Sequence, residues 1–304
     1  MSAELLFLHS FFLFFNKSAI VKDNIDIFIG THRTFDPPVT NPAYKIIVGN
    51  HDIENHSNLE LIKCGNPDDV VDDRFYSEIY MLKWLIKNRE LKDYVGFCHY
   101  RKYFAFMDDI PDMDEIFKEV DAVTAEPIRF PHSIAKTYAL AHNIEDLAIA
   151  GVIIKHRYPE YGEAFMDVTQ GKLLMPYNMV IMKREDFIRC VEFVSGVLDW
   201  YVKIIGTDIE ARIKSKANRY LKKFPPNNSI DYQYRIGGYL AERLTTTFIR
   251  KNFKKVVFFP VKITEKKYDV EYGNKTQKEV WIDRLEQTLG DEDQRAQDAD
   301  EHAS

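Results

Sequence analysis

The sequence has 304 residues, of which 45% are hydrophobic, and its formal net charge is −6. A chain of this size and apolar content can bury a large core, and we expect one globular unit. Because the charge is small for this length and no long basic stripe occurs, nucleic acid is not the expected partner.

The first 20 residues are strongly apolar, with a phenylalanine-rich run at 11–15. The run is too short to span a bilayer, and it lacks the basic start and small-residue cleavage site of a secretory signal. Two interpretations stay open for residues 1–20. They either pack on or lie upstream of the domain, or they form an interfacial anchor that dips into a membrane.

Hydrophobic periodicity predicts strands and helices that alternate along the chain. A helix at 75–88, for example, carries Ile79, Leu82 and Leu85 on one face, and Asn143 is placed to cap a helix at 144–157. Such alternation predicts an α/β sheet with helices on both faces. The strands are expected at 26–30, 44–49, 94–99, 122–125, 178–182 and 256–261, and the remaining helices at 112–120, 187–201 and 231–250.

The C-terminal residues 266–304 differ in composition from the rest of the chain. From Asp283 onward they are acidic, rich in glutamine and poor in large apolar residues. We predict an extension that ends in a disordered tail, and we place the domain at residues 21–265.

Cysteine usage and missing motifs narrow the function. Cys64, Cys98 and Cys190 are odd in number, widely spaced and without a CxxC pair, which predicts a reducing compartment with neither a zinc site nor a disulfide framework. The phosphate-binding patterns GxGxxG and GxxxxGK[ST] are absent, as are GxSxG and HExxH. The sequence therefore contains none of the common motifs that would indicate a nucleotide-binding loop, a serine hydrolase or a zincin.

The most informative segment is 94–104, where a hydrophobic strand ends in His99-Tyr100-Arg101-Lys102. Arginine offers a planar fork of donors for phosphate oxygens, lysine a point charge, and tyrosine a face on which a base or sugar can stack. The segment is predicted to be a ligand site, and the alternative is a loop whose cations pair with nearby carboxylates.

Several blocks in a fixed order resemble a family of glycosyltransferase-like proteins from capsule, exopolysaccharide and O-antigen clusters, long catalogued as a domain of unknown function. The blocks are Gly30-Thr-His-Arg33, Tyr76-Ser-Glu78 through Trp84 to Asn88, Tyr94 to Phe104, Pro176 to Met182, and Tyr234 to Leu244. They span roughly residues 24–262.

The resemblance implies a single GT-A-like, Rossmann-related domain with a mixed sheet. It implies a hexosyltransferase-type reaction in which a nucleotide-diphosphate sugar gives its sugar to a hydroxyl of a saccharide or lipid-linked saccharide acceptor, in surface polysaccharide biosynthesis. We expect the protein in the cytoplasm, with peripheral contact at the inner face of the membrane if the N-terminal run is an anchor.

The expected metal motif of a GT-A fold is not where the resemblance would put it. Most such enzymes place Asp-x-Asp at a strand end to bind a cation. The literal match, Asp112-Met-Asp114, opens a short helix, where capping explains its acidic residues. Two interpretations follow for the strand end. Either His99 helps to hold a Mn or Mg ion, or Arg101 and Lys102 neutralise the diphosphate without one.

The resemblance assigns further residues to the two substrates. Thr31, His32 and Arg33 follow the first strand and join the segment 99–102 as donor-binding candidates.

Tyr177 and Asn178 are acceptor-binding candidates beside a turn. Asp231 and Glu242, expected on one helix, are candidates for the base that deprotonates the acceptor hydroxyl. Glu242 and Arg243 also fit a structural brace, and His142, Glu145 and Asp146 fit a helix entry as well as a cleft wall.

Two rival functions are weighed against glycosyl transfer. A non-catalytic glycan- or nucleotide-binding protein on the same scaffold is favoured if no group in the cleft can act as a base. A nucleotidyltransferase would need a glycine-rich loop and clustered carboxylates, which the sequence does not contain.

Overall fold

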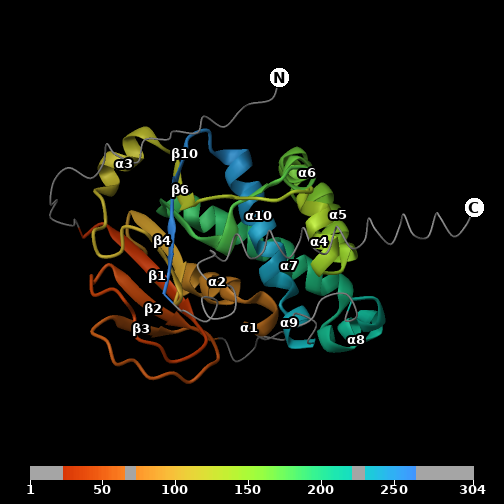
Figure 1. The fold of residues 1–304 in the computed structure, drawn as a ribbon, viewed down its shortest axis with the longest axis horizontal. Coiled ribbons are helices and arrows are strands. Elements are labelled where there is room, and N and C mark those ends of the chain that lie inside the picture. The colour runs from red at the N-terminus through yellow and green to blue at the C-terminus, as the bar shows by residue number, and fades with distance from the viewer. Residues whose placement is uncertain (1–22, 66–72, 221–229, 265–304) are drawn as a thin grey trace, which may run out of the picture.

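A mixed β-sheet forms the centre of the structure (Figure 1). The computed structural model describes residues 23–65, 73–220 and 230–264, and within them the sheet has nine strands. Its principal path is β10 (Val256–Phe259), β6 (Ala122–Ala125), β9 (Val180–Lys183), β4 (Tyr94–His99), β1 (Ile25–Thr31), β2 (Tyr44–Val48) and β3 (Glu60–Lys63). β5 (Lys102–Phe104) pairs with β4 and with β11 (Val261–Ile263), and β7 (Ile128–Arg129) pairs separately with β8 (Leu173–Leu174).

Strand direction decides where a ligand can bind. β3, β2, β1 and β4 are parallel to one another, and β9 is antiparallel to both β4 and β6. β6 therefore runs in the same direction as β4, and the carboxyl ends of β1, β2, β4 and β6 meet at one edge. Ligands of open α/β sheets bind beyond that edge.

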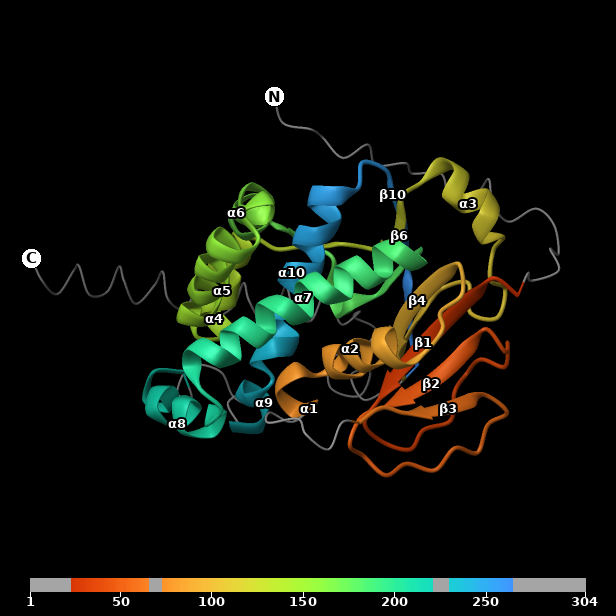
Figure 2. The same cartoon turned by 180° about the vertical axis from the view of Figure 1, so that it is seen from behind.

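Helices flank the sheet, as Figures 1 and 2 show from opposite sides. In chain order they are α1 (Asp73–Tyr76), α2 (Glu78–Asn88), α3 (Met113–Glu119), α4 (Ile134–Ala141), α5 (Ile144–Arg157), α6 (Gly162–Gln170), α7 (Arg184–Ile205), α8 (Ile209–Tyr220), α9 (Ile230–Tyr234) and α10 (Ile236–Asn252). Short 3₁₀ turns occupy Pro159–Tyr161 (η1) and Pro176–Asn178 (η2). The predicted α/β class with a mixed sheet is confirmed.

Alternation along β1 separates two cores. Ile25, Ile27 and Ile29 pack with α3 and β5 on one face, whereas Phe28 packs with α2, α7 and α10 on the other. Successive side chains of a strand point to opposite faces, so a strand covered on both sides is apolar throughout. His99 has the same parity along β4 as Phe97, which belongs to the helix-covered core. The end of β4 therefore presents His99 toward the helices.

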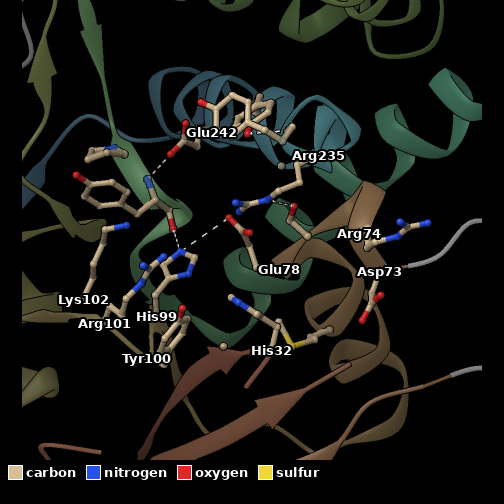
Figure 3. Close-up of a pocket in the computed structure, with 18 of the residues that line it drawn as sticks. His32, Asp73, Arg74, Glu78, His99, Tyr100, Arg101, Lys102, Arg235 and Glu242 are labelled. Atoms are coloured by element: carbon tan, nitrogen blue, oxygen red, sulfur yellow. Dashed lines mark hydrogen bonds and ion pairs between the residues drawn. The ribbon is translucent and has the colours of Figure 1, made fainter. Parts of the chain in front are cut away.

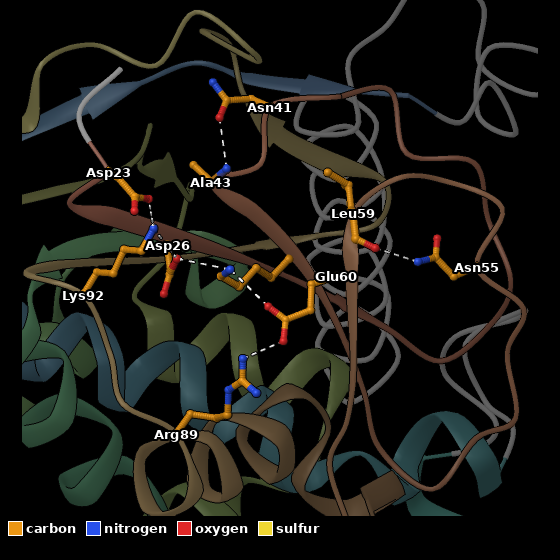
Figure 4. Close-up of polar contacts among 10 residues, drawn as sticks. Asp23, Asp26, Asn41, Ala43, Asn55, Leu59, Glu60, Arg89 and Lys92 are labelled. Atoms are coloured by element: carbon orange, nitrogen blue, oxygen red, sulfur yellow. Dashed lines mark hydrogen bonds and ion pairs between the residues drawn. The ribbon is translucent and has the colours of Figure 1, made fainter. Parts of the chain in front are cut away.

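An ion network joins the opposite, amino edge of the sheet (Figure 4). Lys45 of β2 contacts Glu60 of β3 at 3.1 Å and Asp26 of β1 at 3.6 Å. Arg89, which caps α2, contacts the other oxygen of Glu60 at 2.6 Å, and Lys92 lies 3.4 Å from Asp26. These contacts hold the strands in register away from the edge where a ligand would bind.

Three predicted elements are interrupted in the structure. The predicted helix 75–88 breaks at Ser77, whose φ is 52°, and the predicted helix 231–250 breaks at Arg235. The predicted strand 256–261 divides at Pro260 into β10 and β11, because proline has no N–H for a sheet hydrogen bond. The expectation that Asp231 and Glu242 share one helix was therefore wrong, since α9 carries Asp231 and α10 carries Glu242.

Two glycines let α10 approach the break between α1 and α2. A Cβ on Gly237 would lie 2.5 Å from the Phe75 carbonyl oxygen, and one on Gly238 would lie 2.6 Å from the Ser77 hydroxyl. Such distances are well inside van der Waals contact, so any larger residue would push the helices apart. Glycine is required here because of helix packing.

The predicted N-terminal segment 1–20 and C-terminal extension 266–304 lie outside the described residues. Within the described part of the chain, no helix has both the length and the apolar character needed to cross a membrane.

The close helix contact generates a stability prediction. Gly237→Ala should lower the free energy of unfolding by roughly 1–3 kcal/mol, because the added methyl group overpacks against the Phe75 backbone. Gly162→Ala is the matched control, since nothing lies within 4 Å of the added Cβ on α6. That control should be neutral or slightly stabilising. Equal urea midpoints for both variants would contradict the packing argument.

Candidate active site

A cavity of about 530 Å³ lies at the carboxyl edge of the sheet, a volume typical of small-molecule sites. Its walls come from the ends of β1, β2 and β4, from α1, α2 and α4, and from α9 and α10. The charged and histidine residues that line it are His32, His51, Asp73, Arg74, Glu78, His99, Arg101, Lys102, His142, Asp231, Arg235, Glu242 and Arg243.

One part of the wall is densely cationic. Arg101 comes from the turn after β4, Lys102 from the start of β5, and Arg235 from the junction of α9 and α10, whereas Arg74 of α1 lies at the other side of the view (Figure 3). The Lys102 ammonium lies 4.1 Å from the centre of the Tyr177 ring. Burial, together with the neighbouring Arg101 charge, lowers the pKa of Lys102 to about 8. Cations gathered in this way favour an anionic ligand.

His99 and Glu78 lie between the cations of β4 and α10 (Figure 3). The His99 Nε2 atom donates a hydrogen bond to the Tyr177 carbonyl oxygen at 2.7 Å, which fixes the tautomer, and it lies 3.9 Å from Glu78 Oε1. Burial and the charge of Lys102 lower the pKa of His99 to about 3. His99 is therefore a neutral, oriented side chain at physiological pH.

The two predicted base candidates occupy different depths. Glu242 lines the cavity with a side chain that is 21% exposed; its Oε1 accepts from the Tyr177 amide at 2.8 Å and its Oε2 from Arg243 at 2.9 Å. Asp231 lines the rim, is 88% exposed, and lies 4.0 Å from Arg74. Glu242 is thus held in place, whereas Asp231 is solvated.

The acceptor candidates divide between a lining role and a supporting one. Tyr177 lines the cavity, but Asn178 does not. The Asn178 amide donates to Glu78 Oε1 at 2.6 Å, and its oxygen accepts from Thr245 at 2.8 Å. Both Tyr177 and Asn178 have positive φ, at 68° and 52°, a conformation rare outside glycine and often found at functional sites.

The donor candidates after β1 also divide. Thr31 and His32 line the cavity, but Arg33 does not, and its guanidinium lies 4.9 Å from the centre of the Tyr100 ring. Tyr100, itself in the lining, carries the Arg101 guanidinium at the same distance. Burial, and then the charge of Arg235, lowers the pKa of His32 to about 4, so this imidazole is neutral. The structure brings the predicted donor residues together at one wall, apart from Arg33.

Sequence reasoning missed Glu78, Arg235 and Arg74 as cavity residues. Glu78 and Arg235 lie in two of the blocks that carry the family resemblance, and this position was the one sequence feature that could have identified them as site residues. Their positions depend on the helix breaks at Ser77 and Arg235, which periodicity does not reveal. The helix-entry candidates also separate, since His142 lines the cavity whereas Glu145 and Asp146 pair with Arg212.

The donor atoms of the cavity do not fit a divalent cation. Within the described ranges, no three His, Cys, Asp or Glu side chains are grouped so as to hold a metal ion. His99 Nε2 is already bonded to a carbonyl, and the charge of Lys102 contributes to the lowered pKa of this imidazole. Asp112 accepts from the Asp114 amide at the start of α3, as capping predicts. The Mn or Mg requirement stays a prediction.

The chain belongs to the family described as "Domain of unknown function (DUF4422)", whose model matches residues 26–253. The family resemblance recognised in the sequence is thereby confirmed. No curated protein sequence matches the chain significantly.

Among solved structures, the chain is similar to one described as "WbbM bifunctional glycosytransferase apo structure", with a TM-score of 0.56 and 20% sequence identity. The similarity covers 80% of this chain and 46% of that one, so this chain spans about half the length of its structural relative. At this identity the likeness establishes the fold alone, an α/β domain with a mixed central sheet flanked by helices.

The supporting role of Asn178 can be tested through stability. Asn178→Ala should lower the free energy of unfolding by about 1–3 kcal/mol, because it leaves the buried Glu78 and Thr245 without their amide partner. Asn88→Ala, at the exposed end of α2, should change it by no more than about 0.5 kcal/mol. Urea denaturation measures both. If the Asn178 variant is as stable as the Asn88 variant, the conclusion that Asn178 holds the Glu78 carboxylate in place is contradicted.

Proposed function

We propose that this chain is a glycosyltransferase that transfers a sugar from a nucleotide-diphosphate sugar to a hydroxyl of a saccharide acceptor in surface polysaccharide biosynthesis. The observation that carries the proposal is one cavity, at the carboxyl edge of the sheet, whose lining holds both a group of cations and an anchored carboxylate. The structural relative described as a glycosyltransferase supports the same reaction class.

The cationic wall suits the donor diphosphate. Arg101 presents two-pronged hydrogen-bond donors, and Lys102 adds a compact charge. Both follow directly from the rigid strand β4, and Arg235 approaches from α10. Charge concentrated against a low-dielectric wall binds the leaving diphosphate and stabilises the negative charge that grows on it during transfer. In this proposal no step requires a metal ion.

Glu242 is the proposed base for transfer with inversion. Each carboxylate oxygen can accept more than one hydrogen bond, so the contacts to Tyr177 and Arg243 hold Glu242 and leave capacity for a substrate hydroxyl. The hydroxyl proton passes to Glu242 as the hydroxyl oxygen bonds to the anomeric carbon. The bond from that carbon to the diphosphate breaks, and its electron pair leaves with the nucleoside diphosphate beside Arg101 and Lys102.

The roles of the other predicted residues follow from this arrangement. His99 orients the Tyr177 carbonyl as a neutral donor, and Tyr177 faces the acceptor. Thr31, His32 and Tyr100 line the donor side, and Asp231 at the rim of the cavity is the alternative base. The N-terminal half of the domain would supply most of the nucleotide-sugar site, and Tyr177 and Glu242 of the C-terminal half would face the acceptor.

The proposed reaction is tested by nucleoside diphosphate release from a panel of nucleotide sugars, with and without acceptor glycans, in the presence and absence of EDTA. Glu242→Gln should lower turnover by about 10²- to 10⁴-fold while the affinity for the nucleoside diphosphate stays unchanged, because only the proton acceptor is lost. Asp231→Asn is the matched control and should retain turnover.

If Asp231→Asn loses turnover and Glu242→Gln retains it, Asp231 is the base instead of Glu242. Nucleotide or glycan binding without release from any donor would favour the non-catalytic alternative, and an EDTA-sensitive rate would restore the metal interpretation of His99.

The pKa of Lys102 predicts a pH dependence for donor binding. Its folded-state pKa of about 8 means that the ammonium is present at pH 7 and largely lost at pH 9. Affinity for uridine diphosphate should therefore fall up to about tenfold as pH rises from 7 to 9, since binding requires one added proton at high pH. Lys102→Arg keeps its charge and should flatten the profile. Isothermal titration calorimetry measures both, and identical profiles would exclude Lys102 from the site.

A further inference from the structure

Four of the six buried side-chain atoms that lack a hydrogen-bond partner among the described residues belong to α4, its C-cap and α10. They are Thr137 Oγ1, Tyr138 Oη, His142 Nδ1 and Arg243 Nε. Their residues are at most 6% exposed. Buried polar groups in proteins are nearly always paired, so a cluster of unpaired ones indicates a place where another molecule supplies the partners.

The cluster opens into the cavity. Thr137, His142 and Arg243 all belong to its lining. Tyr138 packs beside them, with its ring 4.8 Å from His142 and 5.2 Å from the Arg243 guanidinium carbon. Three of the four residues therefore share a common wall formed where α4 meets α10, and Tyr138 packs against two of them.

This wall is electrically balanced, unlike the cationic wall near β4. Arg243 is paired with Glu242 at 2.9 Å and also donates to the Tyr239 carbonyl. Burial, together with the charge of Arg243, lowers the pKa of His142 to about 3, so its imidazole is neutral. An anion would find no uncompensated charge here. The wall suits a neutral ligand that both donates and accepts hydrogen bonds.

Aromatic rings complete the wall. His142 stacks on Tyr239 with ring centres 3.9 Å apart and lies 5.8 Å from Tyr232, and both tyrosines line the cavity. Aromatic surface beside hydrogen-bonding groups matches a sugar ring, whose C–H bonds cover one face and whose hydroxyls project from the edge.

We infer that Thr137, His142 and Arg243 form the subsite for a neutral sugar ring of the acceptor glycan. The choice of acceptor rests on the proposed function. The same Arg243 that offers its Nε atom to the ligand holds Glu242 through Nη1, so a hydroxyl-bearing ring bound there lies beside the proposed base. The acceptor is the substrate whose hydroxyl must reach that base.

Thr137→Val provides a sharp test, because valine keeps the shape and removes only the unpaired hydroxyl. It should leave thermal stability unchanged or raise it, and it should weaken sugar binding about two- to tenfold. His142→Phe keeps a stacking ring and removes both ring nitrogens, that is the unpaired Nδ1 and the hydrogen bond with Gln233, and the double variant should lose at least about tenfold in sugar affinity. Thr169→Val is the matched control, since its buried hydroxyl bonds to the Phe165 carbonyl at 2.9 Å and lies outside the cavity lining.

The measurement is saturation-transfer NMR with neutral methyl hexopyranosides and furanosides, with uridine diphosphate binding followed in parallel by calorimetry. The inference predicts that sugar binding falls in the Thr137 and double variants while uridine diphosphate binding stays at the wild-type value. If the protein binds sugar but not uridine diphosphate, the proposed donor site is contradicted and the sugar subsite is still supported.

Two results would overturn the inference itself. One is that no neutral sugar binds the wild-type protein, or that one binds equally to all variants. The other is that the variants weaken only nucleotide-sugar binding, which would assign the wall to the donor sugar.

Discussion

The cavity depends on the close contact between α10 and the break between α1 and α2. Gly237 and Gly238 have no side chains to separate these helices, and the space they leave is filled by the Phe75 backbone and by Ser77. This approach carries Arg235 and Glu242 on α10 toward Glu78 and the end of β4. Without it, the cationic and carboxylate groups would belong to separate surfaces, since β4 and α10 lie far apart in the sequence.

The same contact also gives the cavity two walls of different charge. The wall near β4 gathers Arg101, Lys102 and Arg235, while the wall near α4 holds a compensated Arg243 and a neutral His142. Glu242 contacts both regions, through the Tyr177 amide and through Arg243. A reaction that moves a sugar from an anionic leaving group to the hydroxyl of a neutral compound would need this kind of asymmetry, with the proton acceptor at the boundary.

Sequence patterns predicted the parts of this arrangement that depend on local periodicity. The buried strands β1, β2, β4 and β6 and the helices α3, α5 and α7 appear where alternation and capping place them. The segment His99 to Lys102 was recognisable because a hydrophobic strand runs directly into cations.

Local sequence patterns could not predict the helix breaks or the contacts between segments that are distant in the sequence. The helical period continues through Ser77 and Arg235, yet tertiary packing forces a change of direction at each. Glu78 was therefore placed inside a predicted helix and not among the cavity residues, and Asn178 was predicted to bind the acceptor, whereas its amide contacts Glu78. The wall at Thr137 likewise depends on α4 meeting α10, a contact between segments about a hundred residues apart.

The most direct test of the central claim is a crystal structure of the protein soaked with uridine diphosphate. The account predicts density for both phosphates in the cavity at the end of β4, with their oxygens within hydrogen-bonding distance of Arg101 and Lys102 and with Glu242 facing the β-phosphate side. Phosphates bound outside this cavity, or an ordered nucleotide that leaves Arg101 and Lys102 without contact, would contradict it.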